Sequence, residues 1–510
     1  MVLRADVLVV GAGGSGAVLA ARLSEDPGCE VLVAEAGPVP RTLADFPPDL
    51  LDARLVPGAR AGGAAVRAVP VTLAPGVPYM APRGRFLGGS TTVNGGSFVR
   101  ARREDFGRWS AAAGDDLWSY GRMLPLLRAL ETDLDFGSAP EHGDRGPMPV
   151  GRADPRGHPA AAAFEAAARE LGHPAEPDKN AQGAPGVGPV PSNTRDGRRV
   201  NTGVAYLLGV MDRPNLTVVG GCTVRSLIID RGRATGAVAE RNGERVILEA
   251  GETVLCAGAL VSPHLLHLSG IGPADDLARA GIRVVHDLPS VGAALSDHPH
   301  VVLEWRPRGR LPGPPVSWLG GALHPTSSGS REPGDLEILQ SLVPMAGLAG
   351  GTTTVPGAPL PFFASVQTPR RTGGLRTVSA DPAVPPRVEY GYLETGDDRR
   401  RMREVVRATA EVAAASAFAA VSRGLTAPDA ATLDDDRALD RWIRARLGTS
   451  QHTCGTVPMG SAVDARGRVH GIEGLRVADT SILPTAPLRG PSATAVLIGE
   501  VVARAVRGEL

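Results

Sequence analysis

The residues with the clearest chemical potential lie in a glycine-rich turn near the N-terminus. This turn, residues 11–16, reads GAGGSG and matches the pattern GxGxxG. Gly11 would make the tight turn, Gly13 would let the backbone approach a pyrophosphate, and Gly16 would let a helix pack closely on a strand. Free N–H groups at the start of that helix favour bound phosphate. The spacing therefore predicts a dinucleotide site.

Glu35 is the acidic residue that such a site requires at the end of the next strand. It follows Gly16 by nineteen residues. Its carboxylate can accept hydrogen bonds from an adenosine ribose, and its charge disfavours a 2′-phosphate, so NADP fits poorly. FAD and NAD are both compatible with this motif.

The elements that must position these residues form a βαβ unit. An apolar run over 7–10 predicts a buried strand, 17–23 predicts a helix, and 31–34 predicts a second strand. Further short strands are expected at 216–219, 224–229, 234–241, 246–250 and 253–256. Helices are expected over 160–171, over 397–421, and over 115–135 with Leu124, Leu127 and Leu130 on one face. Residues 306–361 should form loops around short strands, with 347–361 the most mobile part.

A second glycine-rich stretch, residues 82–95, reads PRGRFLGGSTTVNG. Gly88 and Gly89 would let the chain lie flat against a cofactor, because glycines at this density weaken an ordinary strand or helix. Asn94 could offer its amide to the edge of a flavin. The stretch resembles the first signature of the glucose–methanol–choline (GMC) oxidoreductases. The tripeptide Glu35-Ala36-Gly37 also resembles this family rather than the NAD dehydrogenases.

Later segments resemble GMC motifs in the order in which the family carries them. AGALVSP at 257–263 with LSGIG at 268–272 resembles the second signature. VG at 291–292 with LSDHP at 295–299 resembles VGxNLxDHP, with Ala294 in place of the asparagine. HTCGT at 452–456 with Met459-Gly460 resembles HPxGTxxMG, with Thr453 in place of the proline. The run at 474–484 resembles GLRVADxSxxP.

The resemblance implies an α/β fold, with a doubly wound FAD-binding domain of GMC type and an α+β substrate-binding domain. Residues 1–300 would form the N-terminal FAD-binding region, with substrate-side insertions near 150–200. Residues 301–445 would form mainly the substrate-binding region, and 446–510 would return to the FAD domain with the catalytic histidine. The implied FAD contacts are Gly11, Gly13, Ser15, Gly16, Glu35, Arg83, Gly88, Gly89, Asn94, Gly95, Val224, Ala478 and Asp479.

The implied reaction is oxidation of an alcohol, in which a hydroxyl proton and a hydride are lost. FAD would accept the hydride at its N5 atom. A nearby base must take the proton, and a histidine suits this task because its pKa is near neutrality. His452 aligns with the catalytic histidine of the family and is the expected acid/base. His298 is expected to have a structural role, and His264, His267 and His300 carry no motif support.

The sequence departs from the family at the second polar position of the implied site. The family usually places a histidine or asparagine shortly after the SxxP segment, and here that position falls on Gly490. Arg489 is the nearest candidate for a catalytic role: its guanidinium could stabilise an alkoxide or bind an acidic substrate, or it could face a phosphate or solvent. Val93 replaces the histidine through which some relatives attach FAD, so non-covalent FAD is expected.

Short stretches at 114–120, 130–133 and 489–491 resemble the mycofactocin-associated branch of the family. Membership would imply oxidation of a reduced, peptide-derived redox cofactor, with electrons passed to a carrier rather than to oxygen. One alternative is a small-alcohol or choline-type oxidase that produces peroxide. Another is a hydroxynitrile lyase of GMC type, which keeps FAD without net oxidation. A flavin-binding protein without catalytic activity disagrees with the largely intact motif around His452.

The composition narrows the compartment and the partners. The chain of 510 residues carries 54 basic and 54 acidic side chains, whereas a nucleic-acid binder usually has a basic excess. The 4 cysteines form no CxxC pair, so neither a metal site nor a dithiol motif is expected. The sequence predicts no signal peptide or membrane span, which favours a cytoplasmic protein with peripheral membrane contact left open. The expected partners are an alcohol or reduced redox cofactor and an electron acceptor that the sequence does not name.

Overall fold

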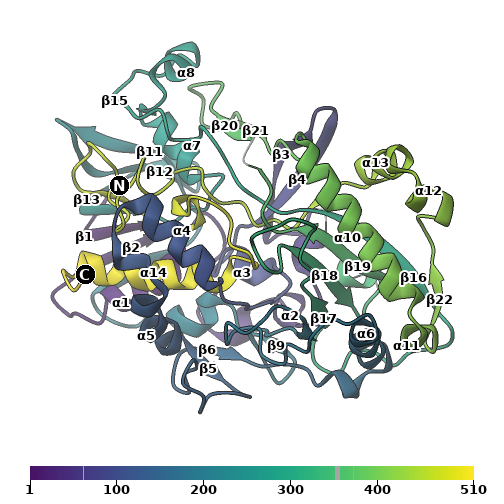
Figure 1. Cartoon of the computed structure of the whole chain (residues 1–510). Coiled ribbons are helices and arrows are strands. Elements are labelled where there is room, and N and C mark those ends of the chain that lie inside the picture. Colours follow the sequence, from purple (N-terminus) through teal and green to yellow (C-terminus); the bar gives the residue numbers. More distant parts are fainter. Residues whose placement is uncertain (61, 351–356, 371–372) are drawn as a thin grey trace.

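The computed structural model describes the whole chain except residues 61, 351–356 and 371–372. Two large sheets occupy opposite sides of the view in Figure 1. The first sheet has the strand order β10-β2-β1-β13-β12-β11, with β24 beside β13. The second has the order β22-β16-β19-β18-β17-β7, with β23 beside β16. Both chain termini lie on the side of the first sheet.

The first sheet combines strands from distant parts of the chain. Its strands are β1 (Val2–Val10), β2 (Val31–Ala34), β10 (Leu216–Val219), β11 (Cys222–Asp230), β12 (Arg233–Arg241), β13 (Glu244–Leu255) and β24 (Leu475–Val477). The pairs β10–β2, β2–β1, β1–β13 and β13–β24 are parallel, whereas β11, β12 and β13 form an antiparallel meander. The apolar strand β2 is buried along its whole length, as expected for a parallel strand covered on both faces.

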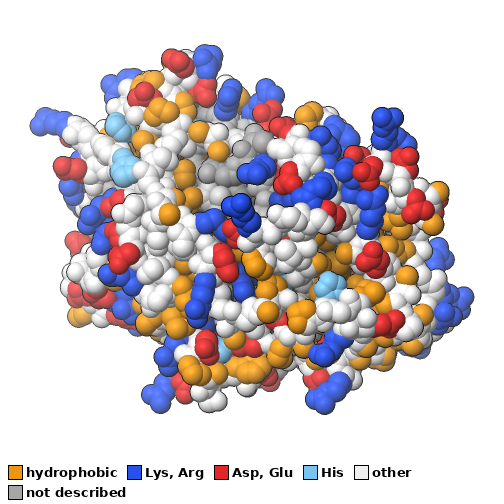
Figure 2. Space-filling view, viewed as in Figure 1, with side chains coloured by type: hydrophobic (Ala, Val, Ile, Leu, Met, Phe, Trp, Pro, Cys, Tyr) orange, Lys and Arg blue, Asp and Glu red, His pale blue; other side chains and the backbone are white. Residues whose placement is uncertain are grey.

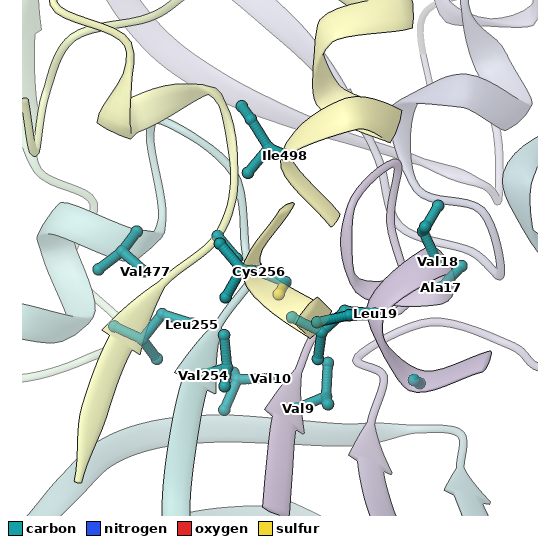
Figure 3. Packing of buried hydrophobic residues seen from close by; sticks show 14 of the residues in the cluster. Val9, Val10, Ala17, Val18, Leu19, Val254, Leu255, Cys256, Val477 and Ile498 are labelled. Atoms are coloured by element: carbon teal, nitrogen blue, oxygen red, sulfur yellow. The ribbon is translucent and has the colours of Figure 1, made fainter. Parts of the chain in front are cut away.

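Helix α1 (Gly16–Leu23) connects β1 to β2, and the C-terminal helix α14 (Ser492–Val506) packs against α1. Figure 3 shows Val10, Leu255 and Val477, from three neighbouring strands, packed near Leu19 of α1 and Ile498 of α14. None of these side chains is more than 3% exposed. Each such side chain contributes about 1.5–3 kcal/mol through burial. This core therefore fixes the C-terminal segment on the N-terminal βαβ unit.

The second sheet has one face covered by helices. Its strands are β7 (Val187–Pro189), β16 (Pro299–Pro307), β17 (Leu319–Leu323), β18 (Leu336–Ser341), β19 (Leu360–Val366), β22 (Ser422–Leu425) and β23 (Gly448–Thr449). The covering helices are α6 (Pro159–Glu170), α10 (Gly396–Ala414) and α11 (Ser416–Ala419), seen at the right of Figure 1. On β16, Val301, Leu303 and Trp305 are buried against this helical layer. The alternating residues His300 and Val302 are only half-buried and lie on the opposite face.

Smaller elements complete the molecule. A four-stranded sheet joins β3 (Val66–Ala74), β4 (Val77–Gly84), β20 (Gly374–Arg376) and β21 (Arg387–Glu389). Two-stranded pairs join β5 (Glu131–Asp133) to β6 (Met148–Val150), β8 (Thr194–Arg195) to β9 (Arg198–Arg199), and β14 (Ile271–Gly272) to β15 (His286–Asp287). The remaining α-helices are α2 (Pro48–Leu51), α3 (Ser90–Val93), α4 (Arg103–Ala113), α5 (Tyr120–Leu130), α7 (Ser262–Leu268), α8 (Ala274–Arg279), α9 (Met345–Leu348), α12 (Ala430–Asp434) and α13 (Asp436–Ala445).

Some expected elements differ from those observed. The two strands expected at 246–250 and 253–256 are one continuous strand, β13. The helix expected over 115–135 is the shorter α5, which contains Pro125 and buries Met123, Leu126, Leu127 and Leu130 while Leu124 stays half-buried. The helix expected over 397–421 ends at Ala414 because Ala415 is extended. The segment expected to be most mobile, 347–361, falls partly outside the described residues.

Candidate active site

The N-terminal glycine turn has the geometry that its spacing predicts. Gly11 has a φ of +102°, a conformation that favours glycine, and an added Cβ there would lie 2.8 Å from the Cys256 carbonyl oxygen. An added Cβ at Gly16 would overlap the Gly11 carbonyl oxygen and lie 2.9 Å from the Cys256 Cβ. The turn and the start of α1 therefore pack directly on the end of β13.

The two glycine-rich stretches meet in space. Gly89 has a φ of +54°, and a Cβ there would lie 2.7 Å from the Cα of Gly13. The backbone N–H of Gly88 donates a hydrogen bond to the Ala12 carbonyl over 2.8 Å. A side chain at Gly89 would therefore push the second stretch away from the GxGxxG turn. The pair forms a backbone cradle at the N-terminal end of α1.

Glu35 and Ser15 tie this turn to other parts of the fold. The Glu35 carboxylate is buried and accepts hydrogen bonds from the N–H groups of Ala12, over 2.8 Å, and Gly37, over 2.7 Å. Burial raises the pKa of Glu35, and these two hydrogen bonds act in the opposite direction. The Ser15 hydroxyl donates to the Ala495 carbonyl over 2.6 Å, so it joins α1 to α14.

Asn94 and Gly95 follow the cradle along the chain. The Asn94 side-chain oxygen accepts from the Gly96 N–H over 2.9 Å and from the Arg199 guanidinium over 3.0 Å. Arg199 also donates to the Asn94 carbonyl and is 1% exposed. The Gly95 carbonyl accepts from the Trp318 indole over 2.8 Å. Arg199 stands in no recognisable sequence motif, so the sequence alone does not indicate it.

The remaining expected cofactor residues lie at strand ends of the first sheet. Val224 is buried on β11, opposite Ala239 and next to a bulge. The Ala478 N–H donates to the Leu255 carbonyl over 2.7 Å, which continues the pairing of β24 with β13. The buried Asp479 carboxylate accepts from the Gly258 N–H, the Ser262 hydroxyl and the Ser481 N–H. Burial raises the pKa of Asp479.

These residues fit a bound FAD. The cradle of Gly13 and Gly89 leaves no room for a Cβ at Gly89. Such close packing of glycines is typical of a site where the backbone approaches a ligand. The N-terminal end of α1 supplies N–H groups for phosphate, and the Glu35 carboxylate lies beside it with lone pairs for ribose hydroxyls. The donor set suits a dinucleotide without a 2′-phosphate.

His452 and His298 form a directly bonded pair of imidazoles. Their Nδ1 atoms are 2.8 Å apart, and their rings meet edge to face at a centroid distance of 5.0 Å. Burial lowers the pKa of His298 to about 3. Burial also lowers the pKa of His452, and the Asp297 and Glu337 carboxylates partly offset this effect. Both rings are therefore neutral near pH 7 and share one hydrogen between their Nδ1 atoms.

Asp297 is the anchor of the segment that carries His452. Its carboxylate accepts from the His452 N–H over 3.1 Å and from the Thr453 hydroxyl over 2.6 Å. Arg83 donates to the same Thr453 hydroxyl over 2.6 Å and also bonds to Gln451. Thr453, which replaces the family's proline, is therefore tied to both charged groups. The structure places Arg83 against the histidine segment rather than at the glycine cradle.

Gly490 lies beside His452, whereas the side chain of its neighbour Arg489 is buried in the interior. Gly490 has no side chain, and a Cβ added there would lie 3.2 Å from the His452 Nε2 atom. The Arg489 side chain is fully buried and donates to the carbonyls of Gly334, over 2.9 Å, and Leu488, over 2.6 Å. Its Nε and Nη2 atoms have no hydrogen-bond partner among the described residues. Burial lowers the pKa of Arg489.

A surface pocket borders the same C-terminal segment. Its volume is about 570 Å³, and Thr485, which follows the SxxP motif, lies in its wall. The charged residues of the wall are Arg331, Glu332, Arg370, Asp397, Arg400 and Arg401. Figure 2 shows basic and acidic side chains interspersed across the visible face of the molecule. No helix among the described residues is long and apolar enough to cross a membrane.

Comparison with known proteins agrees with this geometry. The profile of the N-terminal region of GMC oxidoreductases matches residues 5–300, and that of the C-terminal region matches residues 369–499. The chain is 38% identical over 522 residues to a GMC-type oxidoreductase from the thcA 5′ region of Rhodococcus erythropolis, covering 99% of both chains. It is 33% identical over 536 residues to the oxygen-dependent choline dehydrogenase of Escherichia coli K12, covering 99% of this chain and 96% of the relative.

Solved structures agree as well. The crystal structure of pyridoxine 4-oxidase from Mesorbium loti superposes with a TM-score of 0.91 at 28% identity, covering 99% of both chains. Formate oxidase from Aspergillus oryzae has the same fold, with a TM-score of 0.89 at 24% identity, covering 99% of this chain and 98% of that chain.

The fold and the cradle define a flavoprotein oxidoreductase that acts on CH–OH donors, with FAD as its cofactor. The chain belongs to the GMC oxidoreductase family. The predicted family, α/β fold class, cofactor and enzyme class are thereby confirmed.

Proposed function

We propose that the chain oxidises an alcohol with His452 as the base that takes the hydroxyl proton. The observation that supports this most strongly is the orientation of the imidazole. Its Nδ1 atom is tied to His298 over 2.8 Å, while its Nε2 atom faces the position of Gly490, where no side chain competes for it. Bound FAD supplies the hydride acceptor. The Nε2 atom is therefore available to a substrate hydroxyl.

The neighbours of His452 suit this role. For Nε2 to accept a proton, the Nδ1 atom must carry the ring hydrogen and donate it to His298. Asp297 holds the backbone of His452 in place. When the imidazole becomes positively charged, the Asp297 and Glu337 carboxylates favour that charge. Arg489, which we also proposed as a catalytic residue, is fully buried, so direct contact with substrate would require its unpartnered Nη2 atom.

We further propose that reduced mycofactocin is the substrate and that its electrons pass to a carrier other than oxygen. The alternatives are a small-alcohol or choline-type oxidase that produces peroxide and a hydroxynitrile lyase of GMC type. The short stretches at 114–120, 130–133 and 489–491 support reduced mycofactocin as the substrate. We infer non-covalent FAD because Val93 cannot form a flavin link. We also propose that residues 1–300 form the N-terminal FAD-binding region and that 301–445 form mainly the substrate-binding region. Residues 446–510 would return to the FAD domain. The four free cysteines support a cytoplasmic location.

The test is anaerobic mixing of the FAD-loaded protein with reduced mycofactocin and with a panel of alcohols that includes choline and pyridoxine. The expected result is loss of the oxidised flavin absorbance with at least one donor. Re-admitting oxygen then separates the options, because rapid peroxide formation indicates an oxidase and slow oxygen use with rapid dye reduction indicates a dehydrogenase. An unchanged flavin spectrum with every donor, together with cleavage of a cyanohydrin, would favour the lyase.

A further inference from the structure

Glu337 is a carboxylate on the face of the second sheet that points away from the covering helices, and no sequence motif indicated it. Its strand neighbours Leu336 and Ile338 are buried in the core beneath the helices, so Glu337 points to the opposite face. Its side chain is 17% exposed, whereas the ion-paired Glu131 is 1% exposed and Asp335 is fully buried. The carboxylate therefore lies where a small molecule can reach it.

The strand register places Glu337 in one row with His300. His300 on β16 lies opposite Ser365 on β19, and Ser365 lies opposite Glu337 on β18. Neighbouring strands are about 4.8 Å apart, so Glu337 lies about 10 Å along the sheet from His300. Burial lowers the pKa of His298, His300 and His452, and the negative charge of Glu337 partly offsets this lowering in each. Glu337 therefore faces the three histidines from across the sheet.

A buried chain of polar groups holds Glu337 from behind. The His324 Nε2 atom lies 3.2 Å from Glu337 Oε2, and the His324 Nδ1 atom lies 3.2 Å from the ammonium of Lys179. Lys179, the only lysine of the chain, donates to Glu176 over 2.7 Å. Burial lowers the pKa of Lys179 to about 8, and Glu176 opposes that shift. This chain orients one oxygen of Glu337 and fixes the rotation of its carboxylate.

The other oxygen of Glu337 is unused. Oε1 has no hydrogen-bond partner among the described residues. Burial disfavours the negative charge of this carboxylate. Hydrogen bonding to His324, together with charges that include Arg489, outweighs burial and lowers the pKa of Glu337 to about 2. An ionised carboxylate only accepts hydrogen bonds. An apolar group placed against Oε1 would remove its water without replacing the hydrogen bond.

We propose that Glu337 is a specificity-determining residue that binds a hydrogen-bond-donating substituent, a hydroxyl or a protonated amine, on the alcohol substrate. His324 is the positioning residue for this contact. The inference rests on the proposed function, because it concerns the alcohol that His452 deprotonates. It adds that a simple alcohol is a poorer substrate than one with a second donor. Gly490 supplies no polar side chain beside His452. Glu337 is a polar group that faces the histidines from another element.

The test compares matched alcohols within two series. The first series is 1-propanol, 1,3-propanediol and 3-amino-1-propanol, and the second is benzyl alcohol with its 3-hydroxy and 3-aminomethyl derivatives. The concentration dependence of anaerobic flavin reduction gives an apparent Kd separately from the limiting rate. In the unmodified protein, a donor-bearing member should bind about 10- to 100-fold more tightly than the parent alcohol of its series, the usual effect of a hydrogen bond to a charged group.

Glu337→Gln should reduce this preference to within about threefold of unity while the parent alcohols keep their Kd. The matched control is Glu304→Gln, which removes a carboxylate from the same face of β16, four residues beyond His300, and should keep the preference. If Glu337→Gln does not fold, Glu337→Asp, which withdraws the carboxylate by one methylene, should reduce the preference as well. The relative effect on the diol and on the amino alcohol distinguishes a neutral from a cationic substituent.

Two outcomes would overturn the inference, and they differ in what else they overturn. If the alcohols reduce the flavin but show no preference, or if the preference survives Glu337→Gln, the role of Glu337 is refuted and the proposed function stands. If neither these alcohols nor reduced mycofactocin reduces the flavin in the unmodified protein, the proposed function is refuted and the role of Glu337 with it.

Discussion

Replacing His298 with alanine tests whether the bonded imidazole pair orients the base. His298 contacts the Nδ1 atom of His452 and leaves the Nε2 atom untouched. Its removal would leave the partly buried His452 Nδ1 atom without its partner. The imidazole could then rotate, and its ring hydrogen could move to Nε2, where it would block the acceptance of a proton.

The size of the effect follows from this one contact. A neutral hydrogen bond contributes about 0.5–1.5 kcal/mol net, and a buried polar atom left unpaired costs about 1–3 kcal/mol. These two values describe the same lost contact and are not added, so the loss is about 1–3 kcal/mol, and 1.4 kcal/mol corresponds to tenfold in rate. His298→Ala should therefore slow anaerobic flavin reduction by about 10- to 100-fold. Its FAD content should stay normal, because His298 is not part of the glycine cradle.

Stopped-flow measurement of the limiting rate of flavin reduction provides the assay. The matched control is His300→Ala, two residues further along the chain, whose Nδ1 atom lies 3.3 Å from the Ser450 hydroxyl and makes no bond to His452. The control should change the rate by less than about threefold. Equal losses in the two variants, or a full rate in His298→Ala, would refute the view that the imidazole pair orients the base.

Three further predictions follow from other contacts. Glu35→Gln should weaken FAD retention by about 10- to 100-fold, measured by flavin release on dilution, while the flavin that stays bound is reduced at the normal rate; normal retention would exclude a ribose contact. Hydrogen bonds to Asp133, Asp178 and Glu131 outweigh burial and raise the pKa of His142 to about 10. Because this pKa lies above the unfolded value near 6.5, the resulting stability is complete below about pH 6.5 and is lost as the pH rises through about 10. His142→Gln should therefore lower the melting temperature most at pH 6, by a difference that shrinks towards pH 10; a difference that grows with pH would contradict the charged histidine. Acid precipitation should release all flavin into the supernatant, whereas flavin that stays with the polypeptide would disprove the non-covalent attachment inferred from Val93.

The sequence predicted the first sheet well because its strands are apolar and its turns are marked by glycine. The strand expected at 216–219 is β10, and the helix expected over 160–171 is α6 to within a residue at each end. The predicted boundaries of strands were wrong where pairing with neighbouring strands overrode the local sequence pattern. β13 pairs with β12 up to Glu249 and with β1 from Ile247 to Leu255, so its pairing with β1 carries the strand through the break that the pattern suggested.

The site could be predicted only where motifs carry it. The glycines and His452 stand in recognisable motifs, and the cradle brings the two glycine-rich stretches together. Arg199 and Glu337 stand in no such motif, because their importance comes from strand register and from partners far away in the sequence. Glu337 becomes visible only when β16, β19 and β18 are aligned side by side. Arg489 stood in a motif, yet the sequence does not reveal that its side chain is fully buried.

The most direct measurement is the rate of anaerobic flavin reduction in His452→Ala. With any donor that reduces the unmodified protein, this variant should retain its FAD and reduce it about 10²- to 10⁴-fold more slowly, the range expected for loss of a general base. An unchanged rate in a variant with full flavin content would show that His452 is not the group that takes the proton.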